Sequence, residues 1–123
     1  MTTSEDNKAA TVDFFIGVFN RGDMTLVDRF ISPNYHYNGS PSSPAATAAW
    51  ATGMRAHMPG LEFVVEAILA EDDKVALRWR LLIPASSGQP AGHIVGSNIL
   101  VFAGGQAINN DQGGGSGQDF VPN

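Results

Sequence analysis

The chain has 123 residues, of which 43% are hydrophobic and 15% are charged, and this composition fits one folded domain with a single core. Seven lysines and arginines against twelve acidic residues give a net charge of −5, so neither nucleic acid nor an anionic membrane surface is an expected partner. The chain has no cysteine, which removes disulfides, thiolate nucleophiles and sulfur-ligated metals.

The first residues, MTTSEDNK, are acidic and polar, which is unlike a signal peptide. No apolar run approaches the roughly 20 residues of a membrane span. These features predict a soluble, cytoplasmic protein.

The first half of the chain has helical periodicity. A helix is expected over residues 3–21, with Thr3 or Ser4 as its N-cap and an apolar stripe that includes Phe14, Phe15 and Phe19. A second short helix is expected over residues 24–31, capped by Asp23, and a short strand over residues 34–38. A third helix should run over residues 45–58, with Ser43 and Pro44 at its start.

From residue 61 the hydrophobic period changes to two. Strands are expected over residues 61–69 and 74–83, joined by a polar turn, and over residues 93–103 and 107–110. We therefore predict an α+β fold, with three N-terminal helices packed on a curved, mainly antiparallel sheet. Residues 1–112 form the expected domain, and residues 113–123 a mobile glycine-rich tail.

Three segments carry a resemblance to a known family: FFIGVFNRGDMTLVDRFISPNYHYN, HMPGLEFVVEAILAEDDKVALRWR and NILVFAGGQAI. Their order and spacing, over about residues 14–108, resemble SnoaL-like polyketide cyclases. The resemblance implies the cone-shaped nuclear transport factor 2-like fold, an apolar ligand at its open end, and a homodimer formed through the sheet. Because that superfamily contains cyclases, isomerases, epoxide hydrolases and binding proteins, fold alone does not select a reaction.

The resemblance also suggests catalytic residues. Asn98 occupies the place of the oxyanion-binding acid of ketosteroid isomerases, and an amide there can still donate a hydrogen bond. The base of those isomerases would fall near Gly39, which cannot serve. Limonene-type epoxide hydrolases need an arginine and an aspartate two residues apart, where this chain has Arg78 and Arg80. Both arginines are expected on the outer sheet face.

Asp111 aligns on or beside the acid/base aspartate of the cyclases, and Asn110 aligns near a neighbouring histidine. The tryptophan that precedes this aspartate in the family is absent, and glycines follow it here. Asp111 is therefore either a catalytic carboxylate at the pocket mouth or a polar residue that ends a strand. His57 and His36 are further acid/base candidates, with His93 behind them.

The remaining expectations concern the ligand. A larger set of residues is expected to line its pocket: Tyr35, Tyr37, Trp50, Met54, Trp79, Leu81, Ile94, Leu100 and Asn110, with core packing favoured for Phe63 and Leu81. The predicted function is cofactor-independent acid/base chemistry on a hydrophobic, polyketide-like molecule, by aldol-type cyclisation or isomerisation (a lyase or isomerase). The alternatives are a non-catalytic binding protein and an epoxide-opening enzyme. With no H-E-x-x-H or G-x-x-x-x-G-K-[ST] motif, neither a metal nor a nucleotide is expected.

Overall fold

The computed structural model describes residues 3–123. The first half contains α1 (Ser4–Phe14), the π-helix η1 (Phe15–Asn20), α2 (Thr25–Phe30), β1 (Ile31–Tyr37), β2 (Ser40–Pro41) and α3 (Pro44–His57). The second half contains β3 (Glu62–Glu71), β4 (Lys74–Ile83), β5 (Gly92–Ala103), β6 (Gln106–Gly114), the short 3₁₀ helix η2 (Gly117–Asp119) and β7 (Val121–Pro122).

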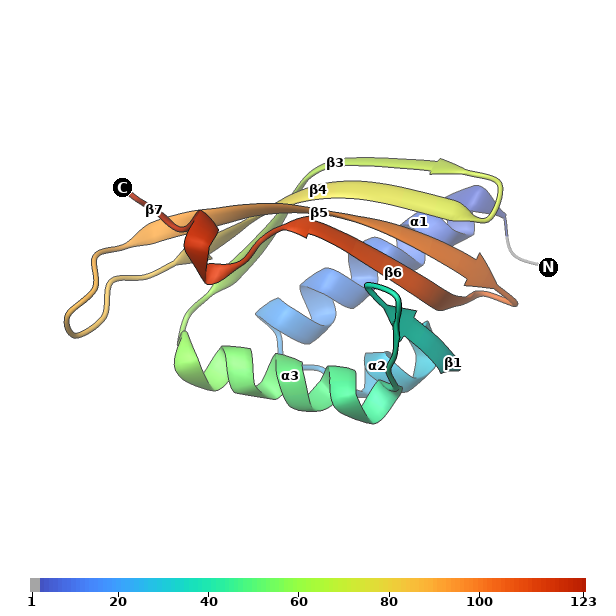
Figure 1. The fold of residues 1–123 in the computed structure, drawn as a ribbon, viewed down its shortest axis with the longest axis horizontal. Helices are drawn as coiled ribbons and strands as arrows, with labels where there is room; N and C mark the ends of the chain where they lie inside the picture. The colour runs from blue at the N-terminus through green and yellow to red at the C-terminus, as the bar shows by residue number, and fades with distance from the viewer. Residues whose placement is uncertain (1–2) are drawn as a thin grey trace.

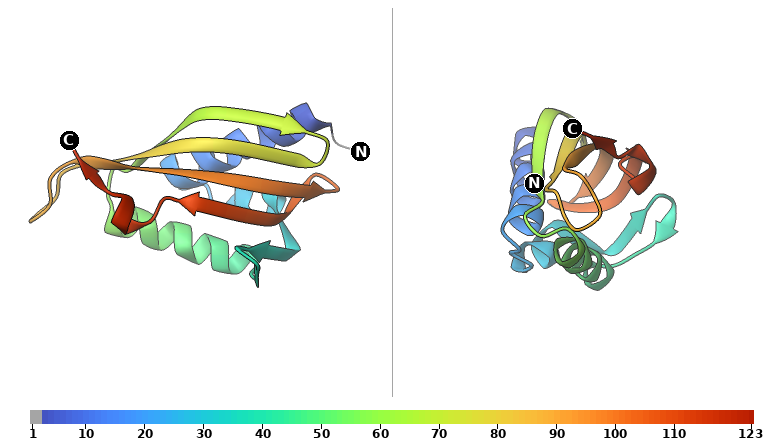
Figure 2. Two further views of the ribbon diagram at one scale, coloured as in Figure 1. Left: turned by 45° about the horizontal axis from the view of Figure 1, so that its top comes forward. Right: turned by 90° about the vertical axis from the view of Figure 1, so that its left-hand side faces the viewer.

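The strands form one sheet in the order β2-β1-β6-β5-β4-β3, and β7 pairs with β5. The sheet arches over α1, α2 and α3, which lie on its concave side (Figure 1). The views in Figure 2 show α1 and α3 apart from each other on this side of the sheet. The α+β class is confirmed. The sheet is mixed, because β1 runs parallel to β6 while all other strand pairs of the sheet are antiparallel. None of the helices within residues 3–123 is both long and apolar enough to cross a membrane.

Two helices begin where the sequence predicts. The Thr3 side chain accepts from the Asp6 amide at 3.1 Å and the Asp6 carboxylate accepts from the Thr3 amide at 3.1 Å, which completes a capping box. The Ser43 hydroxyl accepts from the Ala46 amide at 3.0 Å, and Pro44 takes the first helical position.

The first helix changes its winding at Phe15. Residues 15–20 form a π-helix, whereas one regular helix was expected to residue 21. The wider turn buries Phe14, Phe15, Val18 and Phe19 together. π-Turns inserted in helices often occur at functional sites, and Phe15 and Phe19 both line the pocket described below.

The FN-x-GD motif joins this helix to the sheet and to α2. Asn20 donates to the Phe63 carbonyl at 3.0 Å and accepts from the Phe63 amide at 2.6 Å, so its side chain extends the ladder at the edge strand β3. Gly22 has φ +72°, a conformation that favours glycine. Asp23 Oδ1 then accepts from the Thr25 amide at 3.2 Å, but the N-cap position of α2 is Met24, so the expectation that Asp23 caps this helix is wrong.

Strand β4 alternates as expected. Trp79 and its same-face neighbours are buried on the concave side, while Arg78 and Arg80 point to the outer side. There both arginines meet Glu66, at N–O distances of 3.4 Å and 3.0 Å. Glu66 is the extra residue of a bulge in β3, which places its carboxylate between the two guanidinium groups.

A bulge in β6 decides which of its side chains face inward. Phe102 pairs with Ala107 but Val101 pairs with Asn109, so Ile108 has no partner on β5. Because one extra residue reverses the alternation of a strand, Asn110 faces the concave side after the bulge and Asp111 faces the outer side.

The glycine-rich end is not the loose tail that was expected. Strand β6 continues to Gly114, and β7 pairs with Gly92 and His93 of β5. A capping box between Ser116 and Asp119 shapes the turn between these strands. The end of the chain is therefore part of the sheet.

Candidate functional site

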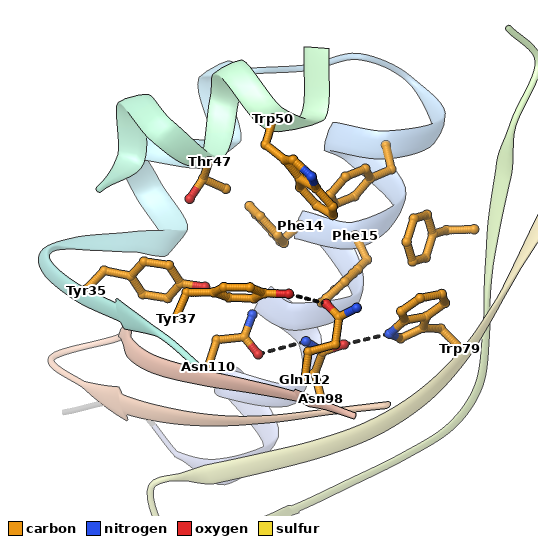
Figure 3. A pocket seen from close by; sticks show the side chains of 12 residues that line it. Phe14, Phe15, Tyr35, Tyr37, Thr47, Trp50, Trp79, Asn98, Asn110 and Gln112 are labelled. Atoms are coloured by element: carbon orange, nitrogen blue, oxygen red, sulfur yellow. Dashed lines mark hydrogen bonds between the residues drawn. The ribbon is translucent and has the colours of Figure 1, made fainter. Parts of the chain in front are cut away.

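A cavity of about 240 Å³ lies between the concave face of the sheet and the helices. It is lined by Phe14, Phe15, Phe19, Tyr35, Tyr37, Thr47, Trp50, Phe63, Trp79, Asn98, Asn110 and Gln112. Figure 3 shows their arrangement, with the tyrosines, the amides and Trp79 on strands, and Phe14, Phe15 and Trp50 on helices. The volume is near the lower end of ligand pockets, roughly 300–1,000 Å³, and suits a molecule of one or two rings.

The apolar wall is a continuous group of aromatic rings. Phe19 lies 4.8 Å from Phe63 between ring centroids, and Phe63 lies 4.8 Å from Trp79. At the other side, Trp50 meets Phe19 edge-on at 5.7 Å and stays 53% exposed. A half-exposed tryptophan beside a cavity provides a flat surface on which an aromatic ligand can stack.

A chain of hydrogen bonds crosses the buried floor of the pocket (Figure 3). The Trp79 indole N–H donates to Asn98 Oδ1 at 2.6 Å, and Asn98 Nδ2 donates to Asn110 Oδ1 at 2.8 Å. The Nδ2 of Asn110 is then turned toward the Tyr35 hydroxyl (Figure 3). Asn98 and Asn110 are only 2% and 8% exposed, so this chain satisfies polar groups that burial would otherwise leave unpaired.

A second, separate chain lies toward the pocket mouth. Tyr37 donates its hydroxyl proton to Gln112 Oε1 at 2.6 Å, and Gln112 Nε2 donates to the Gly114 carbonyl at 3.1 Å. The Gln112 backbone amide also donates to Asn38 Oδ1 at 2.7 Å. These bonds fix the Gln112 side chain against β1.

Trp79 fits closely between two glycines. A Cβ at Gly96 would lie 2.3 Å from the indole, and one at Gly115 would lie 2.5 Å from it. Such distances are far inside van der Waals contact, so both positions must lack a side chain while the ring occupies this place. Gly115 belongs to the glycine run after β6, and that run therefore helps to hold the tryptophan that starts the buried hydrogen-bond chain.

Both tyrosines remain protonated at physiological pH. Burial raises the pKa of Tyr35 to about 12, although the hydrogen bond from Asn110 opposes the rise, and Tyr37 nearby adds to it. Burial also raises the pKa of Tyr37. Each residue therefore acts in the pocket as a neutral hydroxyl.

The acid/base candidates lie elsewhere. Asp111 is exposed on the outer sheet face, where its carboxylate accepts from Asn109 Nδ2 at 3.2 Å, so of the two roles left open by the sequence the catalytic one at the pocket mouth is not supported. His36 is exposed on β1, and His57 is exposed at the end of α3. His93 is half-buried, with its Nδ1 3.5 Å from Asn123 Oδ1.

Five of the nine expected ligand contacts line the pocket, namely Tyr35, Tyr37, Trp50, Trp79 and Asn110, and so does the catalytic candidate Asn98. Leu81, Leu100 and Met54 belong to the core or pack against it and lie outside the pocket lining. Ile94 and His57 line a different cavity of about 250 Å³, beside the β4–β5 loop and Phe120. Substitutions at these positions therefore report on packing or on the second cavity.

Gln112 and Thr47 were not expected in the pocket, Phe14, Phe15 and Phe19 were expected only as an apolar helix stripe, and Phe63 was favoured as core. The helical periodicity of the three phenylalanines was the available signal that they face inward. Gln112 had no such signal, since its inward direction depends on the bulge at Ile108.

The fold and pocket are those of the nuclear transport factor 2-like class, in which a curved sheet and helices enclose a small-molecule pocket. Within that class, the chain belongs to the SnoaL-like polyketide cyclase family, whose model matches residues 9–109.

Solved structures with the same fold have low sequence identity to this chain. A candidate polyketide cyclase from Acidithiobacillus ferrooxidans is 20% identical with a TM-score of 0.76, and the match covers 94% of this chain and 92% of that one. AclR from Streptomyces galilaeus, described as a candidate hydroxylase, is 22% identical with a TM-score of 0.73, covering 91% and 90%. A SnoaL-like polyketide cyclase from Agrobacterium tumefaciens is 14% identical with a TM-score of 0.77, covering 97% and 95%.

The search of curated proteins found no match. Because the similar structures carry the names of both cyclases and a hydroxylase, they show a shared fold and leave the reaction to be argued from the site.

Proposed function

We propose that this protein binds an uncharged, hydrophobic, polyketide-like molecule and promotes an aldol-type cyclisation or isomerisation at a carbonyl group. Catalysis would use hydrogen bonds from neutral groups, without a metal or other cofactor. In the proposed mechanism, the reacting oxygen lies beside Tyr35 and the amides of Asn98 and Asn110, which act as an oxyanion hole.

One observation carries the proposal: the buried tyrosine Tyr35 lines an aromatic pocket, and the Asn110 amide that accepts from Asn98 turns its Nδ2 toward the Tyr35 hydroxyl (Figure 3). An oxygen that accepts from an amide still has its own proton to donate. Because the pKa of Tyr35 is about 12, this proton is present throughout the physiological range. A preorganised donor in a mostly apolar pocket stabilises a developing oxyanion more than water does.

The reaction balances without a cofactor. The enol carbon of the substrate bonds to its ketone carbon, and the ketone oxygen becomes an alkoxide that takes the Tyr35 proton. The enol hydroxyl loses its proton to water, and Tyr35 recovers one from water. The product is an isomer of the substrate, so a carboxylate base is not essential when the substrate enolises readily.

The test measures turnover of aromatic diketones that close by an intramolecular aldol reaction, followed by absorbance. Tyr35→Phe keeps the ring and removes the donor, so turnover should fall roughly 100-fold. Asp111→Asn is the matched control and should keep turnover within about twofold. Full turnover by Tyr35→Phe, or a large loss in Asp111→Asn, would reject this mechanism.

A second candidate is a non-catalytic binding protein of the same fold. It is favoured by the composition of the pocket, since the lining residues within the described chain include neither a carboxylate nor an imidazole. Tight binding of aromatic ketones, without acceleration of any cyclisation over the buffer rate, would support this alternative. An epoxide-opening enzyme is less well supported, because Arg78 and Arg80 lie on the outer face beside Glu66.

A further inference from the structure

The two tyrosines of β1 lie two residues apart, and both present a hydroxyl to the pocket (Figure 3). We propose that they have opposite hydrogen-bonding polarity, and that the pocket therefore selects an uncharged ligand with an acceptor oxygen at Tyr35 and a donor hydroxyl at Tyr37. This inference rests on the proposed function for its ligand class, and it adds the arrangement of polar groups that the ligand must carry.

The polarity at Tyr35 is set by Trp79. An indole N–H can only donate, so the atom of Asn98 that faces it must be Oδ1, which leaves Nδ2 to face Asn110. Asn110 must then present Oδ1 to Asn98 and Nδ2 to Tyr35. Each amide orientation follows from the one before, so the group that Asn110 turns toward the Tyr35 hydroxyl is Nδ2, a donor (Figure 3). The hydroxyl proton of Tyr35 is left for a ligand acceptor.

The polarity at Tyr37 is set by Gly114. A backbone carbonyl can only accept, so the atom of Gln112 that faces it must be Nε2, which leaves Oε1 to face Tyr37. Tyr37 must therefore donate its proton to Gln112, at 2.6 Å. The lone pairs of its oxygen are left for a ligand donor.

A ligand that satisfies both tyrosines carries a carbonyl and a hydroxyl, as hydroxy-ketones and the enols of dicarbonyl compounds do. A carboxylate does not suit the pocket, because no lining residue in the described chain is cationic and burial of an unpaired charge is costly. The observed pairing thus favours a neutral oxygenated aromatic molecule over an aromatic acid.

The test uses two probes of similar size on the full chain at pH 7, with affinity measured by calorimetry and by quenching of Trp50 and Trp79. 2-Acetonaphthone can only accept a hydrogen bond, and 2-naphthol is mainly a donor. Tyr35→Phe should weaken 2-acetonaphthone about tenfold and 2-naphthol less than about twofold, and Tyr37→Phe should give the reverse. Both variants keep the aromatic ring, and circular dichroism checks that they fold.

A third variant separates polarity from loss of the hydroxyl. In Asn110→Asp at about pH 9, the ionised carboxylate accepts one hydrogen bond from Asn98 and a second one from the Tyr35 hydroxyl. Binding of 2-acetonaphthone should then fall as far as in Tyr35→Phe, although the hydroxyl remains.

The outcomes distinguish this inference from the proposed function. Equal losses for the two probes in each variant, or the opposite preference, would overturn the polarity. If each variant weakens only its expected probe but no diketone is turned over, the hydrogen-bonding polarity is supported and catalysis is rejected. If the wild-type chain binds neither probe at millimolar concentration, the inference and the ligand-binding part of the proposed function both fail.

Discussion

The two faces of the sheet carry polar groups of different kinds. On the concave face the polar side chains are neutral amides and phenols, each held by a neighbour in a directed chain. The outer face carries charged groups as well, and there Glu66 meets Arg78 and Arg80 in contact with water. Neutral groups lose less solvation on burial than ions do, so a small dry pocket acquires chemistry through hydrogen bonds rather than through charges.

The largest difference between the faces should appear in stability. Trp79→Ala removes a 3% exposed ring from the concave face and should lower the free energy of unfolding by about 3–5 kcal/mol. Ile99→Ala, on the outer face, is the matched control because its side chain is 52% exposed in the single chain, and it should cost well under about 1 kcal/mol when unfolding is measured on the monomer. Urea unfolding measures both. Similar losses would show that the outer face is covered in solution.

The second prediction concerns pH. Because the pKa of Tyr35 is about 12 against an ordinary 10.0, the folded chain keeps a proton that the unfolded chain loses between these values. Stability should therefore be unaffected by this group below pH 10 and fall from pH 10 to 12, by at most about 3 kcal/mol. The chain has two tyrosines, so absorbance at 295 nm in Tyr37→Phe follows Tyr35 alone. An ordinary titration near pH 10 in the folded variant would contradict the assigned environment.

Asn110 and Asp111 are sequence neighbours on opposite faces and give a smaller, sharper contrast. Asn110→Ala leaves Asn98 Nδ2 without its acceptor and should cost about 1–3 kcal/mol of stability. Asp111→Ala should cost almost nothing, since the side chain is exposed. Thermal unfolding of the two variants makes the comparison. Equal effects would mean that the bulge does not set their directions.

The next prediction is that the outer sheet face forms an interface between two copies of the chain. We expect a homodimer through it, because Leu69 and Ile99 leave 74% and 52% of their surfaces exposed beside the charged cluster. Ile99→Arg should then shift light scattering from dimer to monomer while ligand binding in the pocket is kept. A wild-type monomer at micromolar concentration would refute the dimer.

The smallest effect is expected at Glu66. Hydrogen bonds and charge from Arg80, and then Arg78, hold the pKa of this carboxyl below its ordinary value. Since all three side chains are solvated, Glu66→Gln should leave the thermal midpoint essentially unchanged in 0.15 M salt. A clear loss would indicate that this cluster is buried in an assembly.

The sequence predicted features that depend on local chemistry. Helix starts at Thr3 and Ser43, the alternation of β4 and the inward direction of Trp79 all follow from neighbouring residues. Asn98, found through the family resemblance, does lie in the pocket. By contrast, the π-helix at Phe15 depends on packing between distant elements.

The placement of Asp111 failed for a specific reason. Without the bulge at Ile108, the alternation that puts Ala107 inward would also have put Asp111 inward. A single unpaired residue therefore exchanged the carboxylate for the amides of Asn110 and Gln112 in the pocket. Nothing in the segment AINND identifies the bulged residue, because bulges are set by how the whole ladder closes.

The close fit of Gly96 under the Trp79 ring has an evolutionary consequence. Gly96 has an ordinary backbone conformation, so the indole alone forbids a larger residue there, whereas Gly115 is also held by φ +78°. Gly96→Ala should thus be harmful beside Trp79 and tolerated once a smaller residue replaces the ring. The order in which these two positions change then matters, and a lineage that loses the tryptophan first can fill position 96 and make the return to tryptophan costly.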